Sequence, residues 1–145
     1  MCVFFDFVLD DDAQKIADEA AIISLDRSAL VLRTTPVSTS LNGVTYGSDK
    51  FVAVGNSGVI LTSADGITWT ARTSNTTENL FFCIYANSLY VAVGNGGVIV
   101  TSSDGITWTS RTSGTTEYLW YPAYGNGVYV VVGNRGTILT LSLIH

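Results

Sequence analysis

The feature that most constrains this chain is an internal repeat of 39 residues. Residues 41–79 and 80–118 align without a gap, and 24 of the 39 aligned positions are identical. Residues 119–145 begin a third copy and stop about two-thirds of the way through it. A unit of this size cannot bury its apolar face alone, so neighbouring copies must stack and share a core.

Each full copy contains four short segments with strand character, separated by turn residues. In the first copy these segments are residues 42–46, 51–54, 59–62 and 68–72, and the second one reads as buried on both faces. Four antiparallel strands in about 40 residues are the size of one blade of a β-propeller. The sequence therefore predicts an all-β fold of about three four-stranded blades.

Two turn signals recur inside the copies. Asp65-Gly66 predicts a two-residue hairpin, because such turns need positive φ angles that Asp and Gly tolerate. The run Gly-Asn-Ser-Gly at residues 55–58 predicts a second turn. In propellers, the loops after the second and fourth strands reach the same face, so these Gly-Asn-x-Gly turns should lie beside residues 74–79 and 113–118.

The 39-residue period also extends backwards, since Arg33-Thr34 aligns with Arg72-Thr73 and Arg111-Thr112. Residues 29–35 are therefore expected to be the outer strand of a blade, and residues 21–24 extend that hairpin. Counted this way, the chain holds about twelve strands, whereas rings of this class need four to eight blades. We expect identical chains to close one ring as a homo-dimer or a homo-trimer, with residues 29–35 completing the unfinished blade of a neighbour.

Residues 1–20 break the pattern and are acidic. They form either a short helix over residues 13–20 or a degraded inner part of a fourth blade, and they are a candidate docking element. The apolar start lacks a basic region, so we expect no signal peptide. No stretch approaches the length of a membrane span. Cys2 and Cys83 make a weak case for a disulfide, and Cys83 should be a buried thiol.

The segments SADGITW at residues 63–69 and SSDGITW at residues 102–108 resemble the Asp-box, also called the bacterial neuraminidase repeat. The whole blade, with its VAVGNxGxI core, is most similar to propellers of the photosystem II assembly-factor type. Similar repeats occur in bacteriophage tail proteins and other viral host-recognition proteins. The segments depart from the common box by lacking one residue between Asp and Thr, and the third copy has no box.

This resemblance implies structural roles rather than catalytic ones. In such propellers the Asp binds backbone amides in the turn between the two outer strands, and the Trp packs at the edge of the blade. The residues expected to have these structural roles are Ser63, Asp65, Gly66, Trp69, Ser102, Asp104, Gly105 and Trp108.

Charge and residue types argue against several classes of function. The net charge of −5 argues against a nucleic-acid partner. Seven of the twelve acids lie in residues 1–40, so the repeat region is nearly neutral. The only histidine is His145, which leaves histidine-based acid–base or metal chemistry without a candidate. We therefore expect no metal and no cofactor.

A sialidase-like enzyme is the remote alternative, because such enzymes use three arginines. Arg33, Arg72 and Arg111 occupy one repeat-equivalent position, so blade rotation points them in three directions. We expect them to donate hydrogen bonds within or between blades. Glu78 and Glu117 are also repeat-equivalent and do not share one cleft as paired catalytic carboxylates must. The chain is therefore expected not to be an enzyme.

Binding is the better-supported function. The first residues of the inner strands vary between copies, from Asn-Gly to Phe-Phe to Trp-Tyr, against a constant frame. The candidate ligand-binding residues are Phe82, Tyr118, Trp120, Tyr121 and Arg135. They are suited to stacking on and hydrogen-bonding a sugar; in the alternative interpretation, the aromatics fill gaps between blades or subunits.

The leading hypothesis is a recognition or structural module in a viral tail or host-attachment assembly. Its expected partners are other copies of itself, other virion proteins and a host-surface glycan. The alternative is a cytoplasmic assembly scaffold like the photosystem factors that the repeat resembles.

Overall fold

A computed structural model of the chain describes residues 30–142. From Thr34 onward the chain belongs to one compact unit, and the fold below is that of this unit. The predicted helix at residues 13–20, the hairpin at residues 21–24, Cys2 and Ala29 lie outside the described residues.

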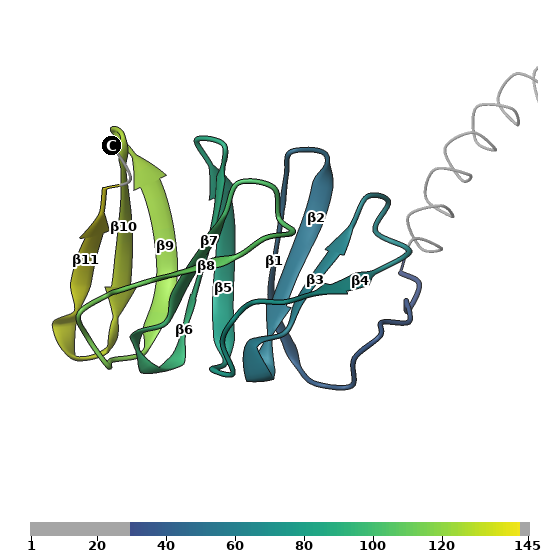
Figure 1. Cartoon of the computed structure of the whole chain (residues 1–145), viewed down its shortest axis with the longest axis horizontal. Coiled ribbons are helices and arrows are strands. Elements are labelled where there is room, and N and C mark those ends of the chain that lie inside the picture. Colours follow the sequence, from purple (N-terminus) through teal and green to yellow (C-terminus); the bar gives the residue numbers. More distant parts are fainter. Residues whose placement is uncertain (1–29, 143–145) are drawn as a thin grey trace, which may run out of the picture. The chain divides into compact units, whose positions relative to one another are not determined.

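The unit consists of three antiparallel sheets, which we call blades 1 to 3 (Figure 1). Blade 1 contains β1 (Leu41–Gly47), β2 (Lys50–Gly55), β3 (Ile60–Ser63) and β4 (Thr70–Arg72). Blade 2 contains β5 (Leu80–Ala86), β6 (Leu89–Gly94), β7 (Ile99–Ser102) and β8 (Thr109–Arg111). Blade 3 contains β9 (Leu119–Gly125), β10 (Val128–Gly133) and β11 (Ile138–Leu141). The predicted all-β, partial propeller-like fold is confirmed, and its blades follow the 39-residue period.

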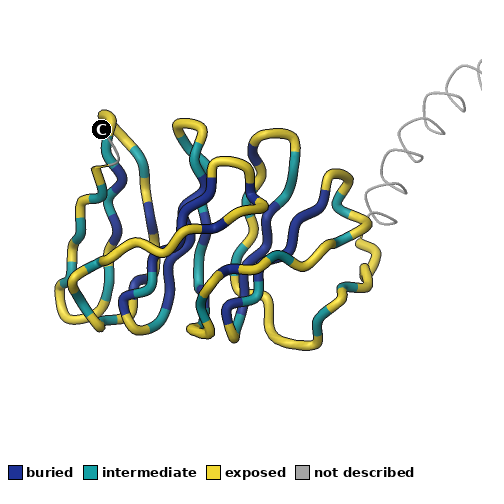
Figure 2. Tube along the Cα trace, in the orientation of Figure 1, coloured by how far each residue is buried: buried dark blue, intermediate teal, exposed yellow. Residues whose placement is uncertain are grey.

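The second strand of each full blade is apolar on both faces, as predicted. Val52 and Val54 are 0% exposed and Ala53, which points the other way, is 4% exposed. Such a strand needs cover on both sides, so it belongs in a stack of sheets rather than on a free surface. Figure 2 shows the buried residues along the strands inside the stack and the exposed ones in the connecting loops.

Two apolar clusters join the blades. Val52 and Val54 of blade 1 pack with Cys83, Ala92 and Trp108 of blade 2. The opposite face of blade 2 packs on blade 3 in a second cluster, which includes Val91, Val93, Leu119 and Val131. Each blade boundary is therefore a dry interface made of repeat-equivalent residues.

Tight two-residue hairpins join the first and second strands of every blade. Their central pairs are Ser48-Asp49, Asn87-Ser88 and Asn126-Gly127, and all six residues have positive φ angles. This is the type I′ geometry that matches the twist of paired strands.

The prediction of a two-residue hairpin at Asp65-Gly66 is wrong. The connection from β3 to β4 spans residues 64–69, and within the pair only Gly66 has a positive φ, of 73°. The Asp65 carboxylate binds amides further along the loop, which holds the loop open at this greater length.

The Gly-Asn-x-Gly turns are confirmed and form η1 (Asn56–Gly58), η2 (Asn95–Gly97) and η3 (Asn134–Gly136). In η1, Gly58 has φ of 70°, and a Cβ there would lie 2.0 Å from the carbonyl oxygen of Thr76. The turn after the second strand thus touches the loop after the fourth strand, as expected. In each blade the backbone N–H of the turn's Asn also donates to a carbonyl oxygen in the loop before that blade. For example, the Asn56 backbone N–H donates to the Ser40 carbonyl oxygen at 2.9 Å.

The structure describes eleven strands. Residues 30–35 form no strand in the isolated chain, so the closing role of residues 29–35 stays a prediction. Arg72 and Arg111 donate from Nε to the Oγ1 atoms of Thr62 and Thr101, at 2.8 and 2.9 Å, across neighbouring strands of their own blades.

Candidate functional site: an aromatic groove on β-bulges

Near the start of the first strand of each blade (the inner strand), one residue has no partner in the pairing with the second strand. In β1 the register shifts between Leu41 and Gly43, so that Asn42 forms a bulge. The equivalent bulges are at Phe81 in β5 and at Trp120 in β9. A bulge re-aims a side chain and is common beside functional sites. The positions that vary most between the copies are therefore the ones that the backbone turns out of the sheet pattern.

Two of these bulge residues bring blades 2 and 3 into aromatic contact. The rings of Phe81 and Trp120 stack with their centroids 4.5 Å apart and an interplanar angle of 16°. Tyr118 lies edge-on to Trp120 at 6.1 Å, and Phe82 meets Tyr121 at 5.0 Å. Four of the predicted binding residues are thus brought together.

A hollow of about 270 Å³ opens beside this cluster. We call it the aromatic groove, and its lining residues are Asn42, Phe81, Phe82, Trp120 and Tyr121. Sequence reasoning left Asn42 and Phe81 out of the site. The signal that points to them is their bulge position, which strand periodicity alone does not reveal.

In blades 1 and 3, the asparagine of the Gly-Asn-x-Gly turn accepts a hydrogen bond from the bulge residue. Trp120 donates from Nε1 to Asn134 Oδ1 at 2.7 Å, and Asn42 donates from Nδ2 to Asn56 Oδ1 at 2.9 Å. Asn42 Nδ2 also reaches the carbonyl oxygen of Leu80 in the next blade, at 2.8 Å. These contacts fix the groove's orientation before any ligand arrives.

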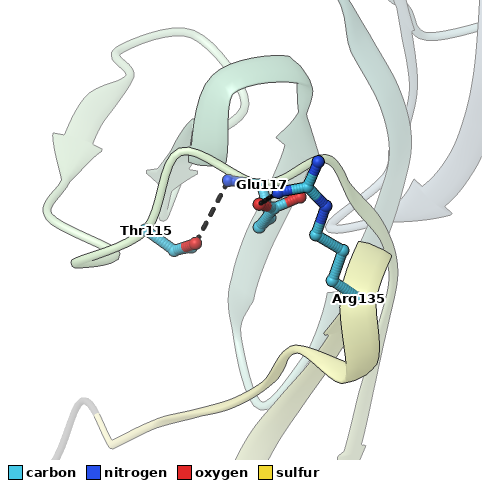
Figure 3. Close-up of polar contacts among 3 residues, drawn as sticks. All are labelled: Thr115, Glu117 and Arg135. Atoms are coloured by element: carbon cyan, nitrogen blue, oxygen red, sulfur yellow. Dashed lines mark hydrogen bonds and ion pairs between the residues drawn. The ribbon is translucent and has the colours of Figure 1, made fainter.

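Arg135 does not line the groove. Its Nη1 lies 3.4 Å from Glu117 Oε1, and its side chain is 84% exposed (Figure 3). The backbone amide of Glu117 in turn donates to Thr115 Oγ1 at 3.1 Å. Such an exposed pair contributes little to stability, so Arg135 is free to exchange its partner.

The segments 63–69 and 102–108 form matching loops, which we call the Asp-Gly loops. In the first, Asp65 Oδ1 accepts hydrogen bonds from the amides of Ile67 and Thr68, at 2.8 and 2.9 Å, and from the Ser63 hydroxyl at 3.0 Å. The Thr68 amide contributes most to lowering the pKa of Asp65, followed by the Ile67 amide. Ser63 Oγ accepts from the Gly66 amide.

The second Asp-Gly loop repeats this geometry. Asp104 Oδ1 accepts from the amides of Ile106 and Thr107, both at 2.8 Å, and the Thr107 bond contributes most to its lowered pKa. Trp108 donates from Nε1 to the Gly105 carbonyl oxygen and is 2% exposed. Trp108 lies in the core between blades 1 and 2, rather than at the edge of its own blade as the resemblance implied.

Within residues 30–142, no group of three or more His, Cys, Asp or Glu side chains could hold a metal ion. No helix in this described part is long and apolar enough to span a bilayer. Comparison with known proteins gives no match to a family model, a curated protein or a solved structure.

Proposed function

We propose that this chain is a non-enzymatic recognition module that binds a glycan in the aromatic groove. The observation that carries the proposal is a row of partly exposed aromatic rings, fixed in place by bulges and hydrogen bonds. Trp120 is 37% exposed and Tyr121 is 57% exposed. Exposed aromatic faces beside fixed polar groups are the chemistry that binds sugar rings.

The polar groups around the groove also suit a neutral sugar. Asn42 lines the groove, Tyr121 is 57% exposed, and Arg135, which lies outside the groove, is paired with Glu117. Recognition of this kind depends on hydrogen bonds and stacking rather than on charge, in keeping with the nearly neutral repeat region. An anionic sugar would need a positive charge to pair with, and Arg135 can supply that charge only if it leaves Glu117.

The Asp-Gly loops support assigning the repeat to the Asp-box type. A carboxylate that binds two successive amides of the turn between two outer strands is what the resemblance implies for that box. From the same resemblance we propose a place in a viral tail or host-attachment assembly. The second candidate, an assembly scaffold, is favoured by the same exposed aromatic side chains, because Tyr and Trp are also enriched at protein interfaces.

A glycan array followed by titration calorimetry on the best binder tests the proposal. Trp120→Ala removes the stacking surface and should weaken binding at least about tenfold, a loss of about 1.4 kcal/mol. Trp120→Phe keeps a ring but loses the bond to Asn134, so its glycan affinity should lie between those of the unmodified protein and Trp120→Ala. Ile106→Ala, on the distant Asp-Gly loop, is the matched control and should bind normally. Absence of any glycan binding, together with protein binding that Trp120→Ala abolishes, would favour the scaffold instead.

A further inference from the structure

The two ends of the blade stack expose surfaces that are buried everywhere else in it. The apolar triplet Val-Val-Ile occurs at the same three repeat positions in every blade. The triplets are Val52, Val54 and Ile60 in blade 1, Val91, Val93 and Ile99 in blade 2, and Val130, Val132 and Ile138 in blade 3. In blades 1 and 2 none of these residues is more than 2% exposed, whereas Val132 is 41% and Ile138 is 68% exposed.

The opposite end shows the complementary surface. Leu41 of blade 1 is 41% exposed, but its equivalents Leu80 and Leu119 are fully buried. Val44 is 59% exposed, while the equivalent Cys83 is 1% exposed. Leu80 and Cys83 pack on the Val-Val-Ile triplet of the blade before them. The exposed face of blade 1 carries the equivalent residues, so it is suited to pack on the exposed triplet of blade 3.

A close aromatic contact between blades 1 and 2 has no counterpart among the described residues at the end of blade 3. The Tyr85 ring covers Gly47 of the blade before it so closely that an added Cβ would lie 2.0 Å from Cδ1. Gly125 is the equivalent of Gly47 in blade 3, and no atom of the described residues lies within 4 Å of such a Cβ there. Tyr46 is the equivalent of Tyr85 and is 56% exposed.

The turn before blade 1 already has the conformation needed to complete another blade. Thr35 donates from Oγ1 to the Val37 carbonyl oxygen at 3.0 Å, which repeats the 3.1 Å bond from Ser74 to Thr76. In blade 1 the Thr76 carbonyl sits against Gly58. Against Gly136 in blade 3, the equivalent position is not occupied by any residue that the structure describes.

The segment before this turn carries the matching hydrogen-bond donor. Arg72 and Arg111 each bind a threonine on the neighbouring strand of their blade. Arg33 is their equivalent by the 39-residue period, and Thr140 on β11 is the equivalent of the two threonines. Among the described strands, β11 is an edge of blade 3, and by the repeat period residues 31–33 correspond to the fourth strand that would pair with it.

We infer that a second copy of this chain covers both ends of the stack. Residues 31–37 of one copy complete blade 3 of the other, and the exposed face of blade 1 packs on the Val-Val-Ile triplet of that blade. Two such junctions close a dimer of six blades, within the four to eight blades that such rings contain. This inference does not rest on glycan binding, although the groove residue Tyr121 lies on the same end face as the triplet: its equivalents Gly43 and Phe82 both face the following blade.

Sedimentation equilibrium of the full chain at micromolar concentration tests the inference. The expected mass is twice 15.5 kDa, and Ile138→Asp should reduce it to that of a single chain. Ile138 is already exposed, so the variant should keep its circular dichroism spectrum. Ile106→Asp is the matched control: the residue is 45% exposed but lies away from both ends, and the dimer should persist. A folded monomer of the unmodified chain, or a dimer unaffected by Ile138→Asp, would overturn the inference.

Cysteine cross-linking tests the register independently. In blade 1 Thr62 pairs with Thr70, and the equivalent pair across the junction is Thr140 with Val31. The variant Val31→Cys/Thr140→Cys, in a Cys2→Ser background, should form a disulfide-linked dimer on oxidation. The control Val31→Cys/Ser110→Cys places the second thiol on an exposed position of β8 and should not cross-link. Equal cross-linking of the two variants would contradict the proposed strand pairing, and a trimer by mass would exclude the six-bladed ring.

Discussion

The hydroxyl of Tyr90 donates a hydrogen bond to the backbone carbonyl of Gly47, across the boundary between blades 2 and 1. Tyr129 makes the equivalent bond to Ala86 across the next boundary. Burial raises the pKa of Tyr90 to about 12, so its hydroxyl remains a donor throughout the neutral range. Each of these hydroxyls thus adds a directional bond within the apolar part of a boundary, which helps to fix how one blade sits on the next.

Replacing Tyr90 by Phe should destabilise the fold by about 1–2 kcal/mol, because a buried carbonyl loses its donor while the ring stays packed. Urea unfolding followed by tryptophan fluorescence measures the change. Tyr85→Phe is the control: it is half-buried at the same boundary, and its hydroxyl makes no hydrogen bond to any described residue. Equal losses for the two variants would show that the Tyr90 bond contributes nothing specific.

Phe51 occupies the repeat position of Tyr90 and Tyr129 but has no hydroxyl. In the proposed dimer it faces Gly125 of the neighbouring copy, whose carbonyl would lack a donor. Because the dimer is closed by two junctions, Phe51→Tyr adds two hydrogen bonds of roughly 1 kcal/mol each and should tighten the dimer about thirtyfold. Sedimentation of a dilution series in the analytical ultracentrifuge measures the dissociation constant of the dimer. A weaker dimer would argue against this contact.

Trp108 and Trp69 are equivalent residues in different surroundings. Trp108 is 2% exposed and Trp69 is half-buried at the end of the stack. Trp108→Ala should cost about 3–5 kcal/mol, because it leaves a cavity in the core between blades 1 and 2. In the monomeric Ile138→Asp background, Trp69→Ala should cost only about 1–2 kcal/mol. Thermal unfolding compares them, and a larger loss for Trp69 in that background would contradict the burial described here.

The Asp-Gly loops should make stability depend on acid pH. Hydrogen bonds from the amides of Thr107 and Ile106 lower the pKa of Asp104 in the folded state, and the corresponding bonds act on Asp65. A folded pKa below the unfolded value, about 3.9, means that the carboxylate stabilises the fold above that pH. This contribution is lost as the pH falls through the folded pKa.

Unfolding free energies measured between about pH 6 and pH 3 should therefore decrease towards the acid end. Asp104→Asn keeps an acceptor but does not titrate, and its decrease should be shallower. Asp104→Ala should cost about 1 kcal/mol at neutral pH, as for the loss of an exposed capping group. An Asp104→Asn profile parallel to that of the unmodified protein would contradict a role for ionised Asp104.

Cys83 should be inert in the native protein. It is 1% exposed, and burial raises the pKa of its thiol to about 12, so almost no thiolate forms at pH 8. In a Cys2→Ser variant, a thiol-specific colour reagent should react with less than about a tenth of the protein within minutes and with all of it in denaturant. Rapid native labelling would mean that the boundary between blades 1 and 2 opens readily.

Local features of the sequence account for most of the fold. The 39-residue period and the apolar second strands predict the blades, and the constant Gly-Asn-x-Gly run predicts the turns η1 to η3. The Asp-Gly pairs were less informative. A dipeptide that suits a tight hairpin also suits a longer loop, and the choice depends on which amides the Asp65 carboxylate reaches.

The candidate site was only partly predictable. Variation between the copies pointed to the start of the inner strands, and the rings of Phe82, Trp120 and Tyr121 do meet there. Neither the bulge at Phe81 nor the pairing of Arg135 with Glu117 could be read from periodicity. A bulge depends on how two strands are aligned, and an ion pair depends on the distance between two loops.

The sequence by itself determined that this chain repeats one four-stranded unit and that the units must share their apolar faces, because periodicity and hydrophobicity are properties of the chain alone. Only the tertiary structure decided which copies of a repeated residue are covered. Ile99 and Ile138 are the same residue at the same repeat position, yet one is 2% and the other 68% exposed. The difference arises because burial is a property of neighbours in space, and among the described residues of a single chain blade 3 has a neighbouring blade on one side only.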